Sequence, residues 1–475
     1  MTADHAIAAI DQGSSSTKGA IVTSDGRRHD EISLPISVES SGGSVSHDPS
    51  EILASVEKIL GNLLSTHQIA AIGLTCQRST CLLWERDSGR PLTPALSWQD
   101  TSQSDRVDEL AAHATLVART TGLPLSPHYA ATKLSSLIDS LPRGRQRAEA
   151  GEIVAGTLDA FLLRQLTGTD GTEPGHAGRS LLFDLEGGTW SPRLADLFGV
   201  PVAALPPIRP SASNRGQYGG VPLTAVAGDQ QAALVGHGGW EDGVTAVHFG
   251  TGAFILAGTG NRALRLDKAL SAVLASTPDR SHFQIEATVN SAGSAVDWAC
   301  RLTGERLDEW QERPLDPDTV PAVFPAFRGA GAPWWRPEAR ALISGLGLDS
   351  PSEQLVSGVL VGVAMRVIDC VELLGEAVTI NRLRISGKLT RLEGLSGLLA
   401  DASGLAVEIA DDEEVGLLGI ARLAIAGLEG TERNLSEPPP LAARREPRWS
   451  EDRATAIRER WLAFSRTAIE LAERR

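Results

Sequence analysis

The chain has 475 residues, more than one hydrophobic core usually supports, so we expect two domains and keep three as an alternative. Its formal net charge of −15 at pH 7 argues against nucleic acid as a partner, because phosphate backbones are bound by basic surfaces. We find no apolar run of membrane-spanning length, no N-terminal secretion pattern and no metal-type spacing of the 4 cysteines. The sequence therefore predicts a cytoplasmic protein with free thiols and without a membrane partner.

The opening segment IAAIDQGSSSTKGAIVTSDG, residues 7–26, has the pattern of strand, turn and strand. A turn of Gly and hydroxyl residues gathers N–H and O–H donors in a small volume, which suits a phosphate, and Lys18 adds positive charge. Asp11 would repel a phosphate unless a divalent cation, usually Mg²⁺, lies between them. The alternative is an ordinary hairpin in which Asp11 caps the turn, and this segment alone does not decide between them.

The segments that follow alternate between helix and strand patterns. A helix is expected over residues 49–64 with Asp48 as its N-cap, and a buried strand over residues 69–77. The alternation continues and predicts an α/β fold with a mixed or parallel sheet. By composition, residues 172–180 are a loop and residues 200–220 an exposed segment near a domain boundary.

A second carboxylate follows an apolar run in AVAGDQQAALVG, residues 225–236. Asp229 is placed there as a general base or as a second metal-binding acid at the end of a strand. The alternative is that Asp229 caps the next helix, and the segment alone favours that cap.

The second half of the chain begins with a pattern that repeats the first. Residues 244–260, VTAVHFGTGAFILAGTG, again have strand, Gly-and-hydroxyl turn and strand. We expect a long, mostly buried helix from Pro351 to about Ala377, a linker over residues 434–449, and a last helix over residues 451–473. The apolar stripe of that last helix should dock on the body, the alternative being a partner-binding helix.

Several ordered motifs together identify a resemblance. IDQGSSSTKGAIV, IAAIGLTCQRST, LLWERDSGRPLTPALSWQD, AGDQQAAL, FGTGAFIL and PAFRGAGAPWWRPEARALISGL resemble segments of the FGGY carbohydrate kinases, and of the glycerol kinases most closely. The similarity covers nearly the whole chain. It implies two ribonuclease-H-like domains of the actin and sugar-kinase superfamily, with ATP in the cleft between them. We expect these domains over residues 1–236 and 237–433, followed by a linker and docking helix over residues 434–475.

The resemblance also implies roles for individual residues. Asp229 would be the catalytic base, and Asp11 and Asp229 would hold Mg²⁺ beside ATP. Substrate-binding residues would be Arg78, Ser79, Trp98, His128, Asp229, Gln230 and Asn290. ATP-binding residues would be Gly13, Ser14, Ser15, Ser16, Lys18, Gly250, Thr251, Gly252, Gly329, Gly331, Gly387 and Lys388.

The expected substrate pocket departs from that of the glycerol kinases. Ser79 stands where they have Glu, His128 where they have Tyr, and Asn290 where they have Phe. These smaller or more polar groups predict a roomier pocket for a polyol or ketose of about four or five carbons. A glycerol kinase proper and a xylulose- or ribulose-type ketose kinase remain alternatives.

The residues expected to bind the nucleotide also differ from those of the family. Ser386, Gly387, Lys388 and Leu389 replace the family's Asp-Gly-Gly-Ala, and Leu392 replaces an Asn, so the nucleotide preference could be altered. Two other classes stay open: a nucleotide-switch ATPase of the actin or chaperone type, and a kinase-derived binding protein without turnover. The expected partner is a small polyol or sugar, and a homodimer is left open.

Overall fold

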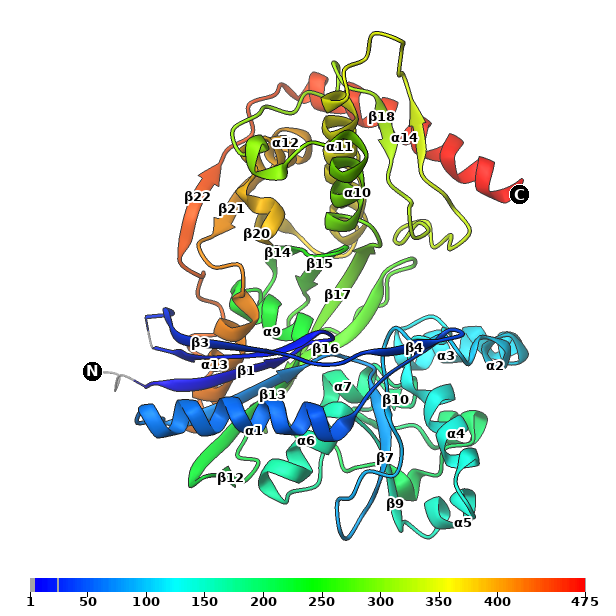
Figure 1. Ribbon diagram of the computed structural model, residues 1–475, viewed down its shortest axis with the longest axis vertical. Coiled ribbons are helices and arrows are strands. Elements are labelled where there is room, and N and C mark those ends of the chain that lie inside the picture. Colours follow the sequence, from blue (N-terminus) through cyan, green and yellow to red (C-terminus); the bar gives the residue numbers. More distant parts are fainter. Residues whose placement is uncertain (1–4, 24, 475) are drawn as a thin grey trace.

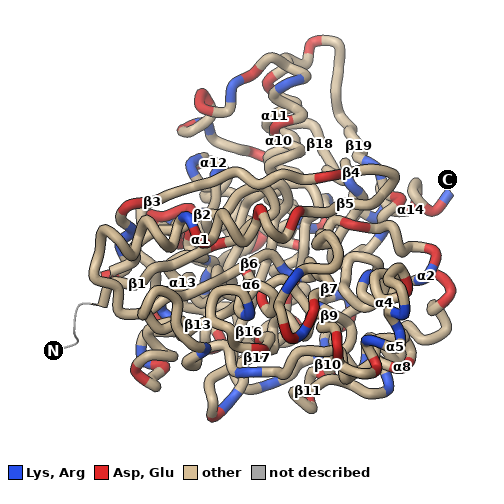
Figure 2. Tube along the Cα trace, turned by 60° about the horizontal axis from the view of Figure 1, so that its bottom comes forward, with Lys and Arg blue, Asp and Glu red and all other residues tan. Residues whose placement is uncertain are grey.

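The computed structural model describes residues 5–23 and 25–474. Residues 1–4, part of the segment searched for a secretion pattern, lie outside the described residues. Two α/β domains are stacked along the longest axis, the first in blue to green below and the second in green to orange above (Figure 1). Charged residues of both signs are dispersed along the described chain (Figure 2).

The first domain is built on a mixed sheet. Among the described residues it has six strands in the order β12-β13-β6-β1-β2-β3. β1 pairs antiparallel with β2 and parallel with β6, which pairs parallel with β13. The carboxyl ends of β1, β6 and β13 therefore meet at one edge of the sheet. The bounds are β1 Ile7–Gln12, β2 Ser16–Val22, β3 Arg28–Pro35, β6 Ala71–Cys76, β12 Gln217–Tyr218 and β13 Val221–Gly228.

The second domain repeats this topology. Its described strands number seven, in the order β16-β17-β15-β14-β20-β21-β22. β14 pairs antiparallel with β15 and parallel with β20, as β1 does with β2 and β6, so the predicted internal repeat is a repeat of fold. The bounds are β14 Gly243–Phe249, β15 Ala253–Gly258, β16 Leu270–Ser276, β17 Ser281–Val289, β20 Ile380–Gly387, β21 Ala406–Ala410 and β22 Leu441–Arg445.

Smaller strands and the helices complete both domains. A third sheet has the order β4-β5-β8-β7-β9, and β10 pairs with β11 and β18 with β19. The remaining strands are β4 Glu39–Ser41, β5 Ser44–His47, β7 Cys81–Glu85, β8 Ala95–Leu96, β9 Ile153–Thr157, β10 Phe183–Asp184, β11 Thr189–Trp190, β18 Ala322–Phe324 and β19 Leu342–Ser344. The helices are α1 Pro49–Thr66, α2 Ser104–Glu109, α3 Ala114–Thr121, α4 Ala130–Ser140, α5 Gly144–Glu149, α6 Leu158–Thr167, α7 Pro174–Gly178, α8 Pro192–Phe198, α9 Asp229–Gly236, α10 Gly293–Thr303, α11 Glu353–Gly375, α12 Glu393–Ser403, α13 Val415–Glu429 and α14 Glu451–Glu473.

Helix α13 comes late in the sequence but packs on the first sheet (Figure 1). Its residues share one hydrophobic cluster with residues of β1, β6, β13 and α9. Glycines allow the close approach: a Cβ at Gly73 of β6 would lie 2.7 Å from the Ile420 carbonyl oxygen, and one at Gly419 would lie 1.7 Å from that of Ala232. The faces of the first sheet are thus covered by α1 on one side and α13 on the other.

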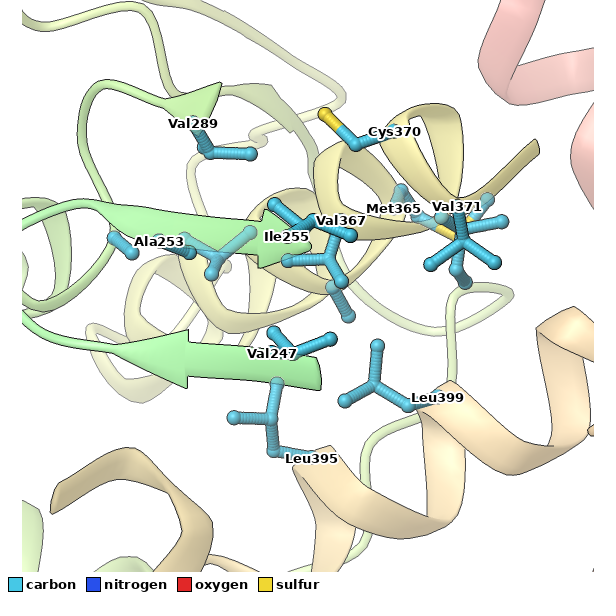
Figure 3. Close-up of a cluster of buried hydrophobic side chains, with 14 of the residues drawn as sticks. Val247, Ala253, Ile255, Val289, Met365, Val367, Cys370, Val371, Leu395 and Leu399 are labelled. Carbon is cyan, nitrogen blue, oxygen red and sulfur yellow. The ribbon is translucent and has the colours of Figure 1, made fainter. Parts of the chain in front are cut away.

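The expectation that no apolar run reaches membrane-spanning length is wrong for helix α11. Residues Glu353–Gly375 are long and apolar enough to span a membrane, with a window of mean hydropathy 1.7, yet 83% of that window is buried inside the protein. The helix forms the centre of the second hydrophobic core. Its Met365, Val367, Cys370 and Val371 lie with strand residues such as Val247 (Figure 3).

Other local predictions have mixed outcomes. The predicted Asp48 cap of α1 is present, and Ser450 caps α14 in the same way, each accepting a hydrogen bond from a backbone N–H of its helix. Residues 172–180 are not only loop, because α7 forms there with the Glu173 carboxylate as its N-cap. Residues 200–220 are not uniformly exposed, since Arg215 is buried. Part of the expected linker is strand β22, which pairs antiparallel with β21.

Candidate active site

Asp11 and Asp229 are brought to the same edge of the first sheet. Asp11 is the fifth residue of β1, opposite Thr75 of β6, and Asp229 directly follows β13. The Oδ1 atom of Asp11 is buried and has no hydrogen-bond partner among the described residues. Burial, followed by repulsion from Asp229 and Glu414, raises the pKa of Asp11 to about 7, although Lys18 opposes the shift. A cation beside this carboxyl group would stabilise its ionised form.

One carboxylate oxygen of Asp229 is fixed by contacts with neighbouring residues. The N-cap of α9 is Gly228, so Asp229 is the first helical residue and the capping interpretation is wrong. Its Oδ1 accepts a hydrogen bond of 2.7 Å from the backbone N–H of Gln230 and lies 3.2 Å from Arg78 Nε. The side chain remains 31% exposed, which leaves it accessible to solvent.

Glu414, just before α13, belongs to the same charged cluster. Its carboxylate forms an ion pair with Lys18 of β2. Burial lowers the pKa of Lys18, but the hydrogen bond and charge of Glu414 outweigh burial and the pKa is raised. Glu414 was not among the predicted site residues, because its partner is 396 positions away in the chain. The only local signal is the acidic run DDEE after a buried strand.

The expected phosphate turn and substrate residues are in direct contact. The Trp98 indole N–H donates a hydrogen bond of 2.8 Å to Ser14 Oγ, and Ser14 donates one of 3.3 Å to Gln77 Oε1. Gly13 N–H closes the turn by donating to the Ser16 carbonyl. The Trp98 ring is 37% exposed, so an apolar face is available next to the turn.

Lys133 of α4 holds together three loops that carry expected substrate residues. Its fully buried ammonium donates to the carbonyl oxygens of Ser79 at 3.2 Å, Ser97 at 2.8 Å and His128 at 3.0 Å. Burial lowers the pKa of Lys133. His128 Nδ1 lies 3.1 Å from the Trp98 carbonyl oxygen, which adds a further link between two of these loops. Lys133 was not among the predicted site residues.

Arg78 joins the first domain to Glu286 on β17 of the second. Two hydrogen bonds of 2.7 and 3.1 Å connect the guanidinium to the carboxylate, and Arg179 pairs with the same carboxylate. Burial tends to raise the pKa of Glu286, but Arg179 and Arg78 outweigh it and lower the pKa to about 2. The Ser79 hydroxyl donates a bond of 3.3 Å to the Arg179 carbonyl. Neither Glu286 nor Arg179 was identified from the sequence.

The expected nucleotide glycines lie at places of close backbone packing. A Cβ at Gly252 would lie 2.5 Å from the Val289 carbonyl oxygen, and one at Gly331 would lie 2.3 Å from that of Thr288. Gly387 has φ 95°, and a Cβ there would lie 2.2 Å from the Phe249 carbonyl oxygen. These glycines bring the end of β14, the turn after it and the end of β20 together at one edge of the second sheet.

The other expected residues lie in different surroundings, some exposed and some buried. Asn290 Nδ2 donates to the Arg328 carbonyl, and its Oδ1 lies beside Gly331, so Asn290 contacts the nucleotide glycines rather than the Arg78 loop. Lys388 is exposed, and Leu392 is buried in the second core. The remaining expected residues lie in the turns already described or next to them: Ser15, Gln230, Gly250, Thr251 and Gly329.

Comparisons with known proteins assign both halves of the chain to one family. Residues 6–236 match the N-terminal domain, and residues 245–428 the C-terminal domain, of the FGGY family of carbohydrate kinases. The chain is 34% identical over 444 residues to a glycerol kinase of Alcanivorax borkumensis, covering 89% of each protein. Over an alignment of 511 positions, gaps included, it is 33% identical to a glycerol kinase of Xanthobacter autotrophicus, covering 98% of each protein.

Solved structures have the same fold. Plasmodium falciparum glycerol kinase with ADP superimposes with a TM-score of 0.89 at 24% identity, covering 98% of each chain. A ligand-bound xylulose kinase of Lactobacillus acidophilus superimposes with a TM-score of 0.88 at 19% identity, again covering 98% of each chain. The repeated sheet topology, the carboxylates at its edge and the matches over both halves lead to one conclusion: the chain belongs to the FGGY family of carbohydrate kinases and is a phosphotransferase that acts on an alcohol with ATP.

Proposed function

We propose that this kinase transfers the terminal phosphoryl group of ATP to a hydroxyl of a polyol or sugar longer than glycerol, with Asp229 as the base and Mg²⁺ held by Asp11 and Asp229. The observation that carries the proposal is a pair of carboxylates at the carboxyl ends of two strands, with a buried Asp11 oxygen that lacks a hydrogen-bond partner in the described chain.

The donor set suits Mg²⁺. No group of three or more His, Cys, Asp or Glu side chains forms a ready-made metal site among residues 5–23 and 25–474. Mg²⁺ usually binds through one or two carboxylates and completes its shell with water and phosphate oxygens, so Asp11 and Asp229 suffice. When bound, the ion would neutralise charge on the phosphates.

Asp229 is suited to accept the substrate proton. Arg78 Nε and the Gln230 N–H hold Oδ1. The other oxygen has no hydrogen-bond partner among the described residues and is available to a substrate hydroxyl. Arg78 is itself fixed by Glu286, so its position is set before the substrate binds. A positioned general base contributes roughly 10²- to 10⁴-fold to the rate.

The surrounding groups can stabilise the transferred phosphoryl group. Lys18 and the N–H and hydroxyl donors of residues 13–16 lie beside Asp11, and the Gly250–Gly252 turn between β14 and β15 would supply further N–H donors from the second domain. Phosphoryl transfer depends mainly on positioning and on neutralising charge, which such donors supply. Exclusion of water as the cleft closes would limit ATP hydrolysis.

The proposed size of the substrate rests on the loops around Trp98. Ser79 is short, and its hydroxyl is engaged by the Arg179 carbonyl, so it leaves room where the glycerol kinases have a Glu. The His128 ring is held against the Trp98 carbonyl by its Nδ1 atom. Both features support a wider pocket with polar walls. Similarity to proteins named glycerol kinase favours glycerol itself as the second candidate, and a xylulose- or ribulose-type ketose kinase as the third.

A coupled ADP-release assay with glycerol, erythritol, ribulose and xylulose tests the proposal. We expect kcat/KM to be higher for a longer substrate than for glycerol, and Asp229→Asn to lower kcat by at least about 100-fold. A clear preference for glycerol would reject the longer substrate while keeping the kinase. Turnover that no substrate stimulates would indicate a nucleotide switch, and no turnover a binding protein. Cell fractionation and light scattering would test the proposed cytoplasmic location and a homodimer.

A further inference from the structure

His248 on β14 faces the interdomain side of the second sheet. Side chains alternate along a strand, and Val247 points into the core formed with α11 and α12 (Figure 3). Ala246, on the same face as His248, packs instead in the cluster that contains β1, β13 and α13 of the first domain. His248 is therefore directed toward the first domain at the carboxyl end of its strand.

Two hydrogen bonds connect His248 to a second histidine through Ser386. Ser386 Oγ, near the end of β20, lies 3.1 Å from His248 Nδ1 and 3.0 Å from His237 Nε2. His237 is fully buried just after α9, and its Nδ1 has no partner in the part of the chain that the structure describes. Burial lowers the pKa of both imidazoles, that of His237 to about 3, so both rings are neutral at pH 7.

These contacts fix which nitrogen of His248 carries the proton. A neutral imidazole has one donor and one acceptor nitrogen, and a buried N–H without an acceptor is rare. The orphan Nδ1 of His237 is therefore the bare nitrogen, and its Nε2–H donates to Ser386. The Ser386 hydroxyl proton then points to Nδ1 of His248, which leaves the proton of His248 on Nε2.

The Nε2 atom of His248 lies beside the Gly250–Gly252 turn of the second domain. It would be 3.8 Å from a Cβ built on Gly250, and the charges that act on the ring include Glu414, Asp229 and Lys18. The ring thus lies between the Gly250–Gly252 turn and the charged cluster of the first domain. By the function proposed above, on which this inference rests, the terminal phosphate of ATP occupies that space.

We propose that His248 donates a hydrogen bond from Nε2–H to the terminal phosphate of ATP, and that Ser386 and His237 are positioning residues that fix its tautomer. A carboxylate in place of Ser386 would favour a protonated ring, whereas the Ser386 hydroxyl maintains a neutral ring with one defined donor.

Binding measurements without sugar test this role apart from turnover. The affinity of the β,γ-imido analogue of ATP and of AMP would be measured by calorimetry for the wild type and for His248→Ala, His248→Gln and Ser386→Ala. We expect His248→Ala to weaken the ATP analogue by about 10- to 100-fold and to leave AMP, which lacks the terminal phosphate, unchanged. His248→Gln should recover part of the loss, because its amide can donate, and Ser386→Ala should show a smaller loss.

A matched control and a spectroscopic readout complete the test. His282→Ala removes another buried histidine of the same sheet, one that bonds the Trp240 carbonyl, and should leave both affinities unchanged. Nitrogen-15 spectra of the wild type should show His248 as the Nε2–H tautomer, and Ser386→Ala should mix the two tautomers. An Nδ1–H tautomer, or an equal loss of affinity for AMP and the ATP analogue, would overturn the inference. A wild type that binds no ATP analogue would instead reject the proposed function.

Discussion

Arg78 and Glu286 connect the two domains through two hydrogen bonds, of 2.7 and 3.1 Å, between buried side chains. The pair also determines where Asp229 lies, because Arg78 Nε is 3.2 Å from its carboxylate. One ion pair thus combines a structural role with the orientation of the proposed base.

Glu286→Gln should be strongly destabilising. It leaves the buried guanidinium groups of Arg78 and Arg179 without their shared carboxylate, and breaking a buried ion pair costs about 3 to 5 kcal/mol in the free energy of unfolding. Denaturant unfolding measures the loss. Glu338→Gln changes a half-exposed carboxylate and should differ from the wild type by less than about 0.5 kcal/mol. Equal stabilities for the two variants would contradict this account.

The same carboxylate should make stability depend on pH in the acid range. The pKa of Glu286 is lowered from 4.5 to about 2, so its contribution is fully present above pH 4.5 and is lost as the pH falls toward 2. The wild type should therefore lose more free energy of unfolding between pH 4.5 and 2 than Glu286→Gln does. Parallel curves for the two proteins over that range would show that Glu286 does not contribute in this way.

Lys133→Met should lower kcat/KM for the sugar and leave KM for ATP nearly unchanged. The change keeps a chain of similar length but removes the donor shared by the carbonyls of Ser79, Ser97 and His128, so the three loops lose their common contact. We expect kcat/KM for the sugar to fall by roughly 100-fold, with KM for ATP within a factor of about two. Steady-state kinetics with each substrate varied in turn separates the two effects.

Lys58→Met is the control for that variant, because Lys58 is exposed on α1. It should leave both KM values unchanged. A Lys133→Met protein that raises KM for ATP as much as KM for the sugar would indicate general loosening rather than a role of Lys133 in the substrate loops.

Asp11→Asn should stabilise the fold and abolish turnover. At pH 8 the Asp11 carboxylate is ionised although burial, Asp229 and Glu414 raise its pKa to about 7, so removing its charge should add roughly 1 to 3 kcal/mol to the free energy of unfolding. Thermal unfolding at pH 8 gives the stability, and the coupled assay with Mg²⁺ gives the activity. A variant that is less stable, or that still turns over at the wild-type rate, would remove Asp11 from the proposed metal site.

The sequence predicts well where its signals are local. The hairpin of β1 and β2 follows from apolar runs on both sides of a Gly-rich turn, and α1 and α14 from their caps and apolar stripes. The sequence does not predict elements whose conformation depends on contacts with other parts of the chain. β22 has no apolar period of its own and becomes a strand because the edge of β21 is open to pairing, and α7 is a single short turn held by the Glu173 carboxylate.

The residues of the candidate site also fall into two groups, those with a local sequence signal and those without one. Asp11 and Asp229 each end an apolar strand, so the sequence marks them, and parallel pairing brings them together. Glu286 lies 208 positions from Arg78, and Ser386 lies 138 from His248 and 149 from His237. No local pattern encodes contacts of that range. They follow from the folded topology.

The placement of α13 limits how the chain can be divided. Since this helix, over Val415–Glu429, covers one face of the sheet that residues 7–228 build, a fragment ending at residue 236 would leave that face bare to water. The two halves recognisable in the sequence are therefore not separable folding units. Truncation at their junction should give an aggregating product, whereas supplying the remaining segment in trans should restore solubility.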